Sequence, residues 1–397
     1  MGYQRLVAPS VLIWSIVSIV GKLPITMAPL GLVFLVRETP GGYVLGATLA
    51  ASYVLGEVAG AAGQGMWLRQ HRIRSHLAIG FTIGAMAFAG LALMPLASAP
   101  VLIALAFLAG AGPAASPGGL RSLLTGMVEE AEVPQALSVE VMLSQVVRAG
   151  APALVVLMAT NMSPVAPVAL AAASTGSAAL LVHLLPASGA EQSAQRSEGR
   201  WRTVMSGWPI YLTSAAAMSL LATAELVLPA LLDYRGIPVS WAGPMLTAFA
   251  VASVIGAFCY GLRAWPGSAR GQALVFLVVT SGCVALVALL PGAGIAVALL
   301  AAGLFQSGIL VTRNLALREQ LPTDLHAPAY SVMYAVQGVG YSLTATAAAA
   351  VLSHAAPSTA ILGGVAITLA LTAVSWLAER SPKVVTAVPS SAVAGER

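Results

Sequence analysis

Long apolar runs separated by short polar segments fill this chain from end to end. A run of about 20 apolar residues can cross the roughly 30 Å hydrocarbon core of a membrane as an α-helix. We predict twelve transmembrane helices, at residues 8–36, 42–62, 78–97, 100–122, 137–159, 165–186, 208–232, 241–262, 272–291, 294–312, 329–353 and 358–378. Each run can satisfy its own backbone hydrogen bonds, whereas strands of an outer-membrane barrel are shorter and alternate in polarity. The pattern predicts an all-α membrane protein.

The composition places most of the chain in lipid. Hydrophobic residues make up 58% of the sequence and charged residues only 8%, and the mean hydropathy is +0.88. A water-soluble protein carries about 25% charged residues because its surface must be solvated. The first run is too long for the apolar region of a secretory signal and contains Lys22, so we expect it to be retained as a helix.

A polar segment at residues 187–207 divides the chain. We expect it to be a cytoplasmic linker between two six-helix halves, at 1–186 and 208–378, with a flexible tail at 379–397. Weak self-similarity at a shift of about 193 residues supports a duplication. The segment Ala136-Leu137-Ser138-Val139 is similar to Ala329-Tyr330-Ser331-Val332. Two pseudo-symmetric halves follow from this pattern.

Arginine and lysine lie almost entirely in alternate loops, which predicts the orientation. Such residues are retained on the cytoplasmic side. With a cytoplasmic N-terminus, only Arg37 and Arg235 lie outside. The inner segments then hold Arg5, Arg69, Arg72, Arg74, Arg196, Arg200, Arg202, Arg263, Arg270, Arg313, Arg318, Arg380, Lys383 and Arg397. We therefore predict that both termini are cytoplasmic, and that the net charge of +5 reflects topology rather than a nucleic-acid partner.

Four charged residues fall deep inside the predicted spans, Lys22, Glu57, Arg148 and Glu225, while Arg121 and Glu140 lie nearer the cytoplasmic ends of theirs. A charge at the centre of a membrane helix costs roughly 3 kcal/mol, so such residues face a protein interior or a water-filled cavity. We expect Lys22 and Arg148 to contact a substrate. Glu57 and Glu225 are candidate proton carriers, because burial and nearby charges shift the proton affinity of carboxyl groups in opposite directions.

A purely structural role is the alternative for each of these charges. Lys22 is then paired with Glu57 or Glu225, and Glu57 with Arg121 or Arg148. Glu225 is alternatively a solvated carboxylate at the outer interface. The sequence leaves these alternatives open.

Aromatic and amide side chains form a stripe along the predicted helix at 329–353. Tyr330, Tyr334, Gln337 and Tyr341 are spaced by four, three and four residues and therefore share one helical face. Such a stripe suits the wall of a binding site for a drug-sized ligand. Tyr330 has an alternative explanation as an anchor at the membrane interface.

Two further aromatic residues precede the buried charges at helical spacing. Trp14 lies about two turns before Lys22, and Tyr53 one turn before Glu57. We expect both to face the cavity. Pro24 follows Lys22 closely, and we expect it to break the helix locally and expose backbone groups.

Three short motifs resemble the major facilitator superfamily, and the likeness extends over about all twelve spans. They are Gly21-Lys22-Leu23-Pro24 followed by Met27, Pro29, Leu30 and Gly31; Pro113, Pro117, Gly118 and Arg121; and Ser138-Val139-Glu140 followed by Gly150 and Pro152. The closest likeness is to bacterial drug and metabolite exporters. The resemblance implies alternating access through a site between the two halves.

The family's gating motif is altered in this chain. Residues 65–74 take the place of a Gly-x-x-x-Asp-Arg loop, with Arg69 where the acid would be. The gating candidates are Arg69, Arg121, Glu140 and Arg313. Helix 137–159 has Gly150-Ala151-Pro152 where exporters often have Gly-Pro, which weakens the antiporter assignment.

Enzyme chemistry has little support. Five histidines and two cysteines show no metal-ligand spacing, and no phosphate-binding Gly-x-x-x-x-Gly-Lys loop occurs. We expect no cofactor and no metal, and a monomer in a bacterial cytoplasmic membrane. The leading interpretation is a secondary exporter of a small organic molecule in exchange for protons. The alternatives are a proton-linked importer of a sugar or other metabolite, and a transporter-like membrane sensor that transports nothing.

Overall fold

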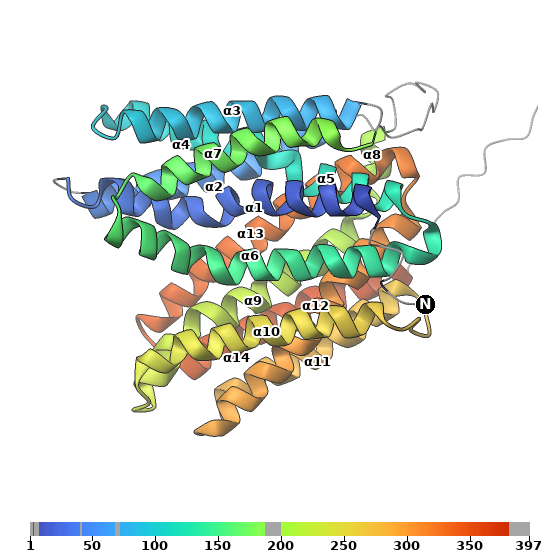
Figure 1. Cartoon of the computed structure of the whole chain (residues 1–397). Coiled ribbons are helices and arrows are strands. Elements are labelled where there is room, and N and C mark those ends of the chain that lie inside the picture. Colours follow the sequence, from blue (N-terminus) through green and yellow to red (C-terminus); the bar gives the residue numbers. More distant parts are fainter. Residues whose placement is uncertain (1–2, 4–7, 40–41, 68–71, 187–199, 381–397) are drawn as a thin grey trace, which may run out of the picture.

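The computed structural model shows a bundle of long helices with short connections (Figure 1). It describes residue 3 and residues 8–39, 42–67, 72–186 and 200–380. The helices are α1 (Pro9–Val36), α2 (Gly42–Trp67), α3 (Ile73–Leu93), α4 (Ala99–Ala111), α5 (Ser116–Met127), α6 (Val133–Asn161), α7 (Ala166–Leu181), α8 (Arg200–Met205), α9 (Trp208–Tyr234), α10 (Ala242–Gly261), α11 (Ala269–Leu289), α12 (Ala293–Gln320), α13 (His326–Leu352) and α14 (Pro357–Arg380). Within the described residues, twelve spans are long and apolar enough to cross a membrane. The all-α membrane fold is confirmed.

Several boundaries differ from the predicted ones by up to five residues, and two spans depart further. The fourth is made of α4 and α5 joined by a short 3₁₀ turn at Gly112–Ala115, where Pro113 and Pro117 cannot donate backbone hydrogen bonds. The tenth, α12, continues to Gln320 rather than ending at 312. Its polar residues Thr312 and Arg313 are buried in protein, so they extend the helix instead of beginning a loop.

The predicted linker falls largely on residues 187–199, which lie outside the described part. After them, α8 forms a short helix. Its Val204 packs with Tyr211 and Leu317 of the second group of spans. The last eight residues of the predicted linker, 200–207, therefore begin with a short helix.

Close backbone contact between α2 and α4 explains two of the glycines of α2, Gly56 and Gly60. A Cβ atom on Gly56 would lie 2.1 Å from the carbonyl oxygen of Phe107, and one on Gly60 would lie 2.5 Å from that of Ala111. From the other side, a Cβ on Gly110 would lie 2.1 Å from the carbonyl oxygen of Tyr53. Small residues let membrane helices approach this closely.

Helix α1 is continuous, which corrects the predicted break at Pro24. Both Pro24 and Pro29 lie inside the helix. Gly21 has a packing role instead: a Cβ there would come within 2.9 Å of the ring of Phe81 on α3. Lys22 is thus presented by a regular helix.

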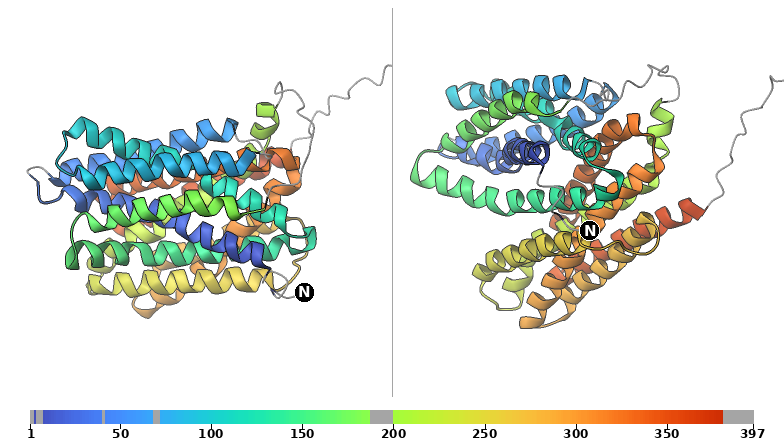
Figure 2. Two further views of the ribbon diagram at one scale, coloured as in Figure 1. Left: turned by 45° about the horizontal axis from the view of Figure 1, so that its top comes forward. Right: turned by 45° about the vertical axis from the view of Figure 1, so that its right-hand side comes forward.

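We call α1–α7 the N-half and α9–α14 the C-half. We call the end of the bundle where α1 begins the N-face. Figure 1 and the right-hand view of Figure 2 show the two groups of helices converging toward the N-face and diverging toward the other end.

The packing clusters explain this shape. Away from the N-face, the core around Leu32 and Phe88 is built by the N-half alone, and the core around Leu228 and Leu299 by the C-half alone. The clusters that join the halves lie toward the N-face. One contains Leu137, Val141, Ala257, Tyr260 and Val311, and another brings Ala327 of the C-half into the N-half core. Apolar packing therefore closes the bundle at the N-face.

Candidate functional site

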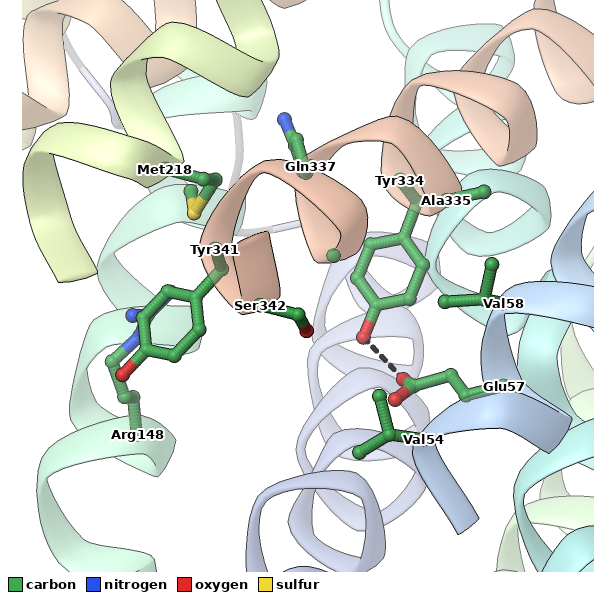
Figure 3. A pocket seen from close by; sticks show the side chains of 11 residues that line it. Val54, Glu57, Val58, Arg148, Met218, Tyr334, Ala335, Gln337, Tyr341 and Ser342 are labelled. Atoms are coloured by element: carbon green, nitrogen blue, oxygen red, sulfur yellow. Dashed lines mark hydrogen bonds between the residues drawn. The ribbon is translucent and has the colours of Figure 1, made fainter. Parts of the chain in front are cut away.

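Two adjoining cavities lie between the halves. The outer cavity has a volume of about 240 Å³ and is lined by Val54, Glu57, Val58, Arg148, Met218, Tyr334, Ala335, Gln337, Gly338, Tyr341 and Ser342 (Figure 3). The deep cavity, about 140 Å³, extends toward the N-face and is lined by Lys22, Ile25, Thr26, Pro117, Arg121, Glu140, Val141, Ser144, Gln145, Val147, Arg148, Met218, Leu310, Asn314, Tyr334 and Gln337. The two share Arg148, Met218, Tyr334 and Gln337, which come from both halves. These cavities are the candidate site.

Lys22, Glu140 and Arg121 form a charged triad in the deep cavity. The Lys22 Nζ atom lies 2.5 Å from Glu140 Oε1 and donates to Ser144 Oγ at 2.6 Å. The Arg121 Nη2 atom donates to the same Glu140 oxygen at 3.0 Å. One carboxylate thus serves two cations, and the triad keeps a net positive charge. Lys22 is paired with Glu140 rather than with Glu57 or Glu225, which corrects the sequence-based pairing.

Glu57 meets a hydroxyl group instead of a cation. The Tyr334 hydroxyl, on α13 of the C-half, donates to Glu57 Oε1 at 2.6 Å (Figure 3). Among the described residues, no ion pair of Glu57 with Arg121 or Arg148 is formed, because those two arginines lie against Glu140 and Glu225. The Glu57–Tyr334 hydrogen bond therefore links the two halves within the outer cavity.

Arg148 and Glu225 form a second contact between the halves. The Arg148 Nη1 atom lies 3.8 Å from Glu225 Oε1, which is an ion-pair distance but too long for a hydrogen bond. The Tyr341 hydroxyl donates to Glu225 Oε2 at 3.3 Å. Figure 3 shows Arg148 and Tyr341 on the wall of the outer cavity. The side chain of Arg148 is 36% exposed, so it is the cation most open to the cavity.

Three predicted aromatic contacts lie elsewhere. Trp14 is fully buried in the N-half core, where its Nε1 atom donates to the Leu120 carbonyl at 2.7 Å. Tyr53 packs in another N-half core, with its ring 6.1 Å from that of Phe88. The expectation that Trp14 and Tyr53 line the cavity is wrong, because apolar packing within the N-half takes both rings. Tyr330 is buried beneath the Arg121 guanidinium of the N-half, not at the membrane surface.

The gating candidates have different environments. Arg69 lies outside the described residues. Arg121 and Glu140 belong to the triad, and the Arg121 guanidinium also lies over the Tyr330 ring, 5.4 Å from its centroid. Arg313 is 1% exposed, and its Nη1 atom donates to the Thr213 carbonyl at 2.9 Å within the C-half. Arg313 is therefore not a loop residue at the inner surface.

A bridge across the N-face was missed by sequence reasoning. The Arg318 Nη2 atom lies 2.5 Å from Glu130 Oε2, and Arg318 Nη1 donates to the Thr125 carbonyl at 3.3 Å. A signal was present in the acidic run Glu129-Glu130-Ala131-Glu132, which occupies an otherwise basic side of the predicted topology. The deep-cavity residues Gln145 and Asn314 were also missed. Asn314 was assigned to a loop because the predicted span ended too early.

No family model and no curated protein sequence matches this chain. Solved structures do match it. The fucose:proton symporter of E. coli superposes with a TM-score of 0.74 at 14% identity, over 94% of this chain and 98% of the symporter. The human organic anion transporter MFSD10 gives 0.72 at 12% identity, over 93% and 100%. A bacterial homologue of the iron transporter ferroportin, in an outward-facing state, gives 0.73 at 15% identity, over 93% and 97%. This chain is thus a multi-pass membrane protein with the fold of the major facilitator superfamily transporters.

Proposed function

We propose that this protein is a proton-coupled secondary transporter of a small organic molecule, working by alternating access in a bacterial cytoplasmic membrane. The observation that carries the proposal is the charged cavity between the halves, where Glu57–Tyr334 and Arg148–Glu225 are contacts from one half to the other. Charged side chains deep in a membrane bundle are costly and typically mark a pathway for ions or substrate. Transporter folds place such sites between their halves near the membrane midplane.

Alternating access requires that the closed end of the bundle can open. The contacts that hold the two halves together at the N-face are of modest strength. They consist of the apolar cluster around Leu137 and Tyr260 and the Arg318–Glu130 bridge. With the N-face cytoplasmic, as the arginine distribution predicts, this closure makes the present state outward-facing. Separation of these contacts, together with packing of the opposite ends, gives the inward-facing state.

Glu57 and Glu225 are the proposed proton sites. Both line or border the cavity, and each has a tyrosine hydroxyl as a hydrogen-bond partner from α13. A hydroxyl can donate to a carboxylate and accept from a carboxylic acid, so the contact persists in either protonation state. Protons can therefore bind and leave without an unpaired polar group.

The direction of coupling depends on what the substrate contacts. The sequence resemblance to exporters favours export in exchange for protons, which requires that substrate and proton compete for a carboxylate. The Arg148–Glu225 pair favours the alternative, uptake together with protons. A proton on Glu225 removes the counter-charge of Arg148 and leaves the arginine available to a substrate. On this geometry we propose cotransport, and export by exchange is the outcome that would replace it.

Transport in proteoliposomes tests the proposal. Purified protein is reconstituted with a pH-sensitive dye inside the vesicles, and candidate organic solutes are added under pH gradients of either sign. Cotransport predicts that the solute enters together with protons when the outside is acidic. Extrusion of solute against incoming protons would establish exchange. A protein that moves no solute under either gradient is not a transporter, and the sensor alternative would then stand.

A further inference from the structure

We infer that the substrate carries an anionic group, such as a carboxylate, which binds in the deep cavity between Arg148, Lys22 and Arg121. This inference rests on the proposed transport function and names the substrate class of that site. It follows from the charges that line the deep cavity, from donor atoms left without partners, and from the loose contact of Arg148.

The first argument is the balance of charge. Three cationic side chains line the deep cavity, from α1, α5 and α6, whereas Glu140 is the only carboxylate among its lining residues. Glu140 is 2% exposed and already contacts both Lys22 and Arg121. Even with Glu225 counted as the counter-charge of Arg148, the three cations outnumber the two carboxylates. In this low-dielectric setting an anion is attracted far more strongly than in water. A cationic substrate would be repelled by the same lining.

The second argument is an unsatisfied arginine. Arg121 is only 9% exposed, and its Nε and Nη1 atoms are buried without a hydrogen-bond partner. A buried charged donor without an acceptor is costly, and hydrogen bonds to charged groups are worth about 1.5–3 kcal/mol. An anionic oxygen would accept from these two groups of the arginine and relieve it.

The third argument concerns Arg148, at the junction of the two cavities. Its only described ionic partner, Glu225, is 3.8 Å away, and no hydrogen bond joins them. The groups that face Glu225 among the described residues are Arg148 from α6 and the Tyr341 hydroxyl from α13. When Glu225 is protonated, Arg148 has no counter-charge and can turn to an anion. Proton and anion therefore favour each other's binding, and this coupling is reciprocal.

The lining of the outer cavity indicates the chemistry of the rest of the substrate. The outer cavity joins the deep one at Met218 and Tyr334 and is bordered by Tyr341 and Val54. Aromatic and thioether groups favour an apolar or aromatic body. An anionic head in the deep cavity and a ring-sized body in the outer cavity would fill both.

Matched probes of one shape and different charge test this inference. Benzoate, benzamide and benzylamine share a ring and differ in the charge of the attached group. The corresponding carboxylates, amides and amines of naphthalene and cyclohexane extend the set. Thermal unfolding of the purified full-length protein is followed with each probe, because a ligand that binds only the folded state raises Tm. We expect at least one carboxylate to raise Tm while its amide and amine do not. Stabilisation by amines or amides alone, or by no carboxylate, overturns the inference.

Two variants locate the binding site. Arg148→Gln should abolish the carboxylate-dependent rise in Tm, and Arg148→Lys should restore part of it. The matched control is Arg263→Gln, which removes an exposed arginine after α10 and should keep the wild-type response. An undiminished response in Arg148→Gln would place the anion elsewhere and overturn the inference. The unliganded Tm of each variant separates loss of binding from loss of folding.

Failure of the inference and failure of the proposed transport function give different results. If proteoliposomes move a neutral or cationic solute under a pH gradient while carboxylates neither bind nor move, transport stands and the anionic substrate is wrong. If carboxylates stabilise the protein through Arg148 but nothing is transported, the binding site stands and the protein is a sensor.

Discussion

Tyr334 of the C-half donates a hydrogen bond of 2.6 Å to Glu57 of the N-half, inside the cavity that separates them. This contact couples a titratable group to the interface that must rearrange in the proposed transport cycle. Because the tyrosine hydroxyl can donate or accept, it remains a partner of Glu57 with or without a proton. The pair is therefore suited to carry a proton through a conformational change.

Replacement of Glu57 by Gln should uncouple transport from the pH gradient. The amide oxygen still accepts from Tyr334, so the fold and the inter-half contact are kept, but no proton can be bound. We expect pH-driven accumulation of a transported solute to fall at least tenfold, while exchange of labelled for unlabelled solute keeps half or more of its rate. Both are measured in proteoliposomes.

The control for this change is Glu38→Gln, which neutralises an exposed carboxylate, 68% accessible, in the loop after α1. It should accumulate solute as wild type does. If Glu57→Gln also responds fully to the gradient, Glu57 carries no proton and Glu225 becomes the remaining candidate.

Arg318→Gln should open the N-face. The Arg318–Glu130 bridge is partly exposed, with 15% and 80% of the two side chains accessible, so we expect its loss to cost about 1 kcal/mol in the closed state. That is about fivefold in the ratio of closed to open molecules. Glu130→Gln should have a smaller effect in the same direction, because Arg318 then keeps its hydrogen bond to the Thr125 carbonyl. The double variant should do no more than Arg318→Gln alone.

Cysteine labelling measures this opening. Ala327 is fully buried where the C-half enters the N-half core. Ala327→Cys is made in a chain with Cys259 and Cys283 replaced by Ala, and a membrane-impermeant thiol reagent is applied to the N-face. The rate of labelling should rise about fivefold in Arg318→Gln. An unchanged rate would mean that the bridge does not hold the N-face closed.

The twelve spans could be predicted from sequence because lipid imposes a long apolar run on every helix. Errors arose where protein, not lipid, surrounds the chain. Thr312 and Arg313 continue α12 because they are buried against other helices, an environment that hydropathy does not distinguish from a loop. The same ambiguity misplaced Trp14, because a buried face and a cavity face of one helix carry the same kinds of residues.

Individual charges in the site could be found, but their partners could not. Lys22, Glu57, Arg148 and Glu225 stand out in apolar runs. Their partners come from helices that are distant in the sequence. Lys22 and Glu140, for example, are separated by 118 residues. No local spacing encodes that distance. One pair does follow from the predicted topology, since Glu130, in the turn before α6, and Arg318, in the last turn of α12, lie at the same end of the bundle.

Gly118→Ala should also disfavour the closed N-face. A Cβ atom at Gly118 would lie 2.5 Å from Ser331 Oγ and 2.7 Å from the Ser331 backbone nitrogen, and backbone cannot move aside as a flexible side chain can. The clash exists only while α5 and α13 are in contact, so it raises the energy of the closed state alone. We expect faster labelling of Ala327→Cys than in wild type.

Gly126→Ala on the same helix is the matched control, because a Cβ there meets nothing within 4 Å. It removes a helical glycine without a clash and should leave the labelling rate unchanged. Equal rates in the two variants would show that the α5–α13 contact is not specific to the closed state.

Glu140→Gln should destabilise the protein far more than Lys22→Gln. The first change leaves Lys22 and Arg121 as two buried cations, 12% and 10% exposed, around a neutral amide. Breaking a buried ion pair in this way costs about 3–5 kcal/mol, chiefly because a charge is left uncompensated. After Lys22→Gln, by contrast, Arg121 still neutralises Glu140 at 3.0 Å. Thermal unfolding of wild type, Glu140→Gln and Lys22→Gln in one detergent gives their order of stability directly. If the two variants lose equal stability, the triad acts as independent contacts; if Lys22→Gln is the less stable, Glu140 depends on Lys22 rather than on Arg121.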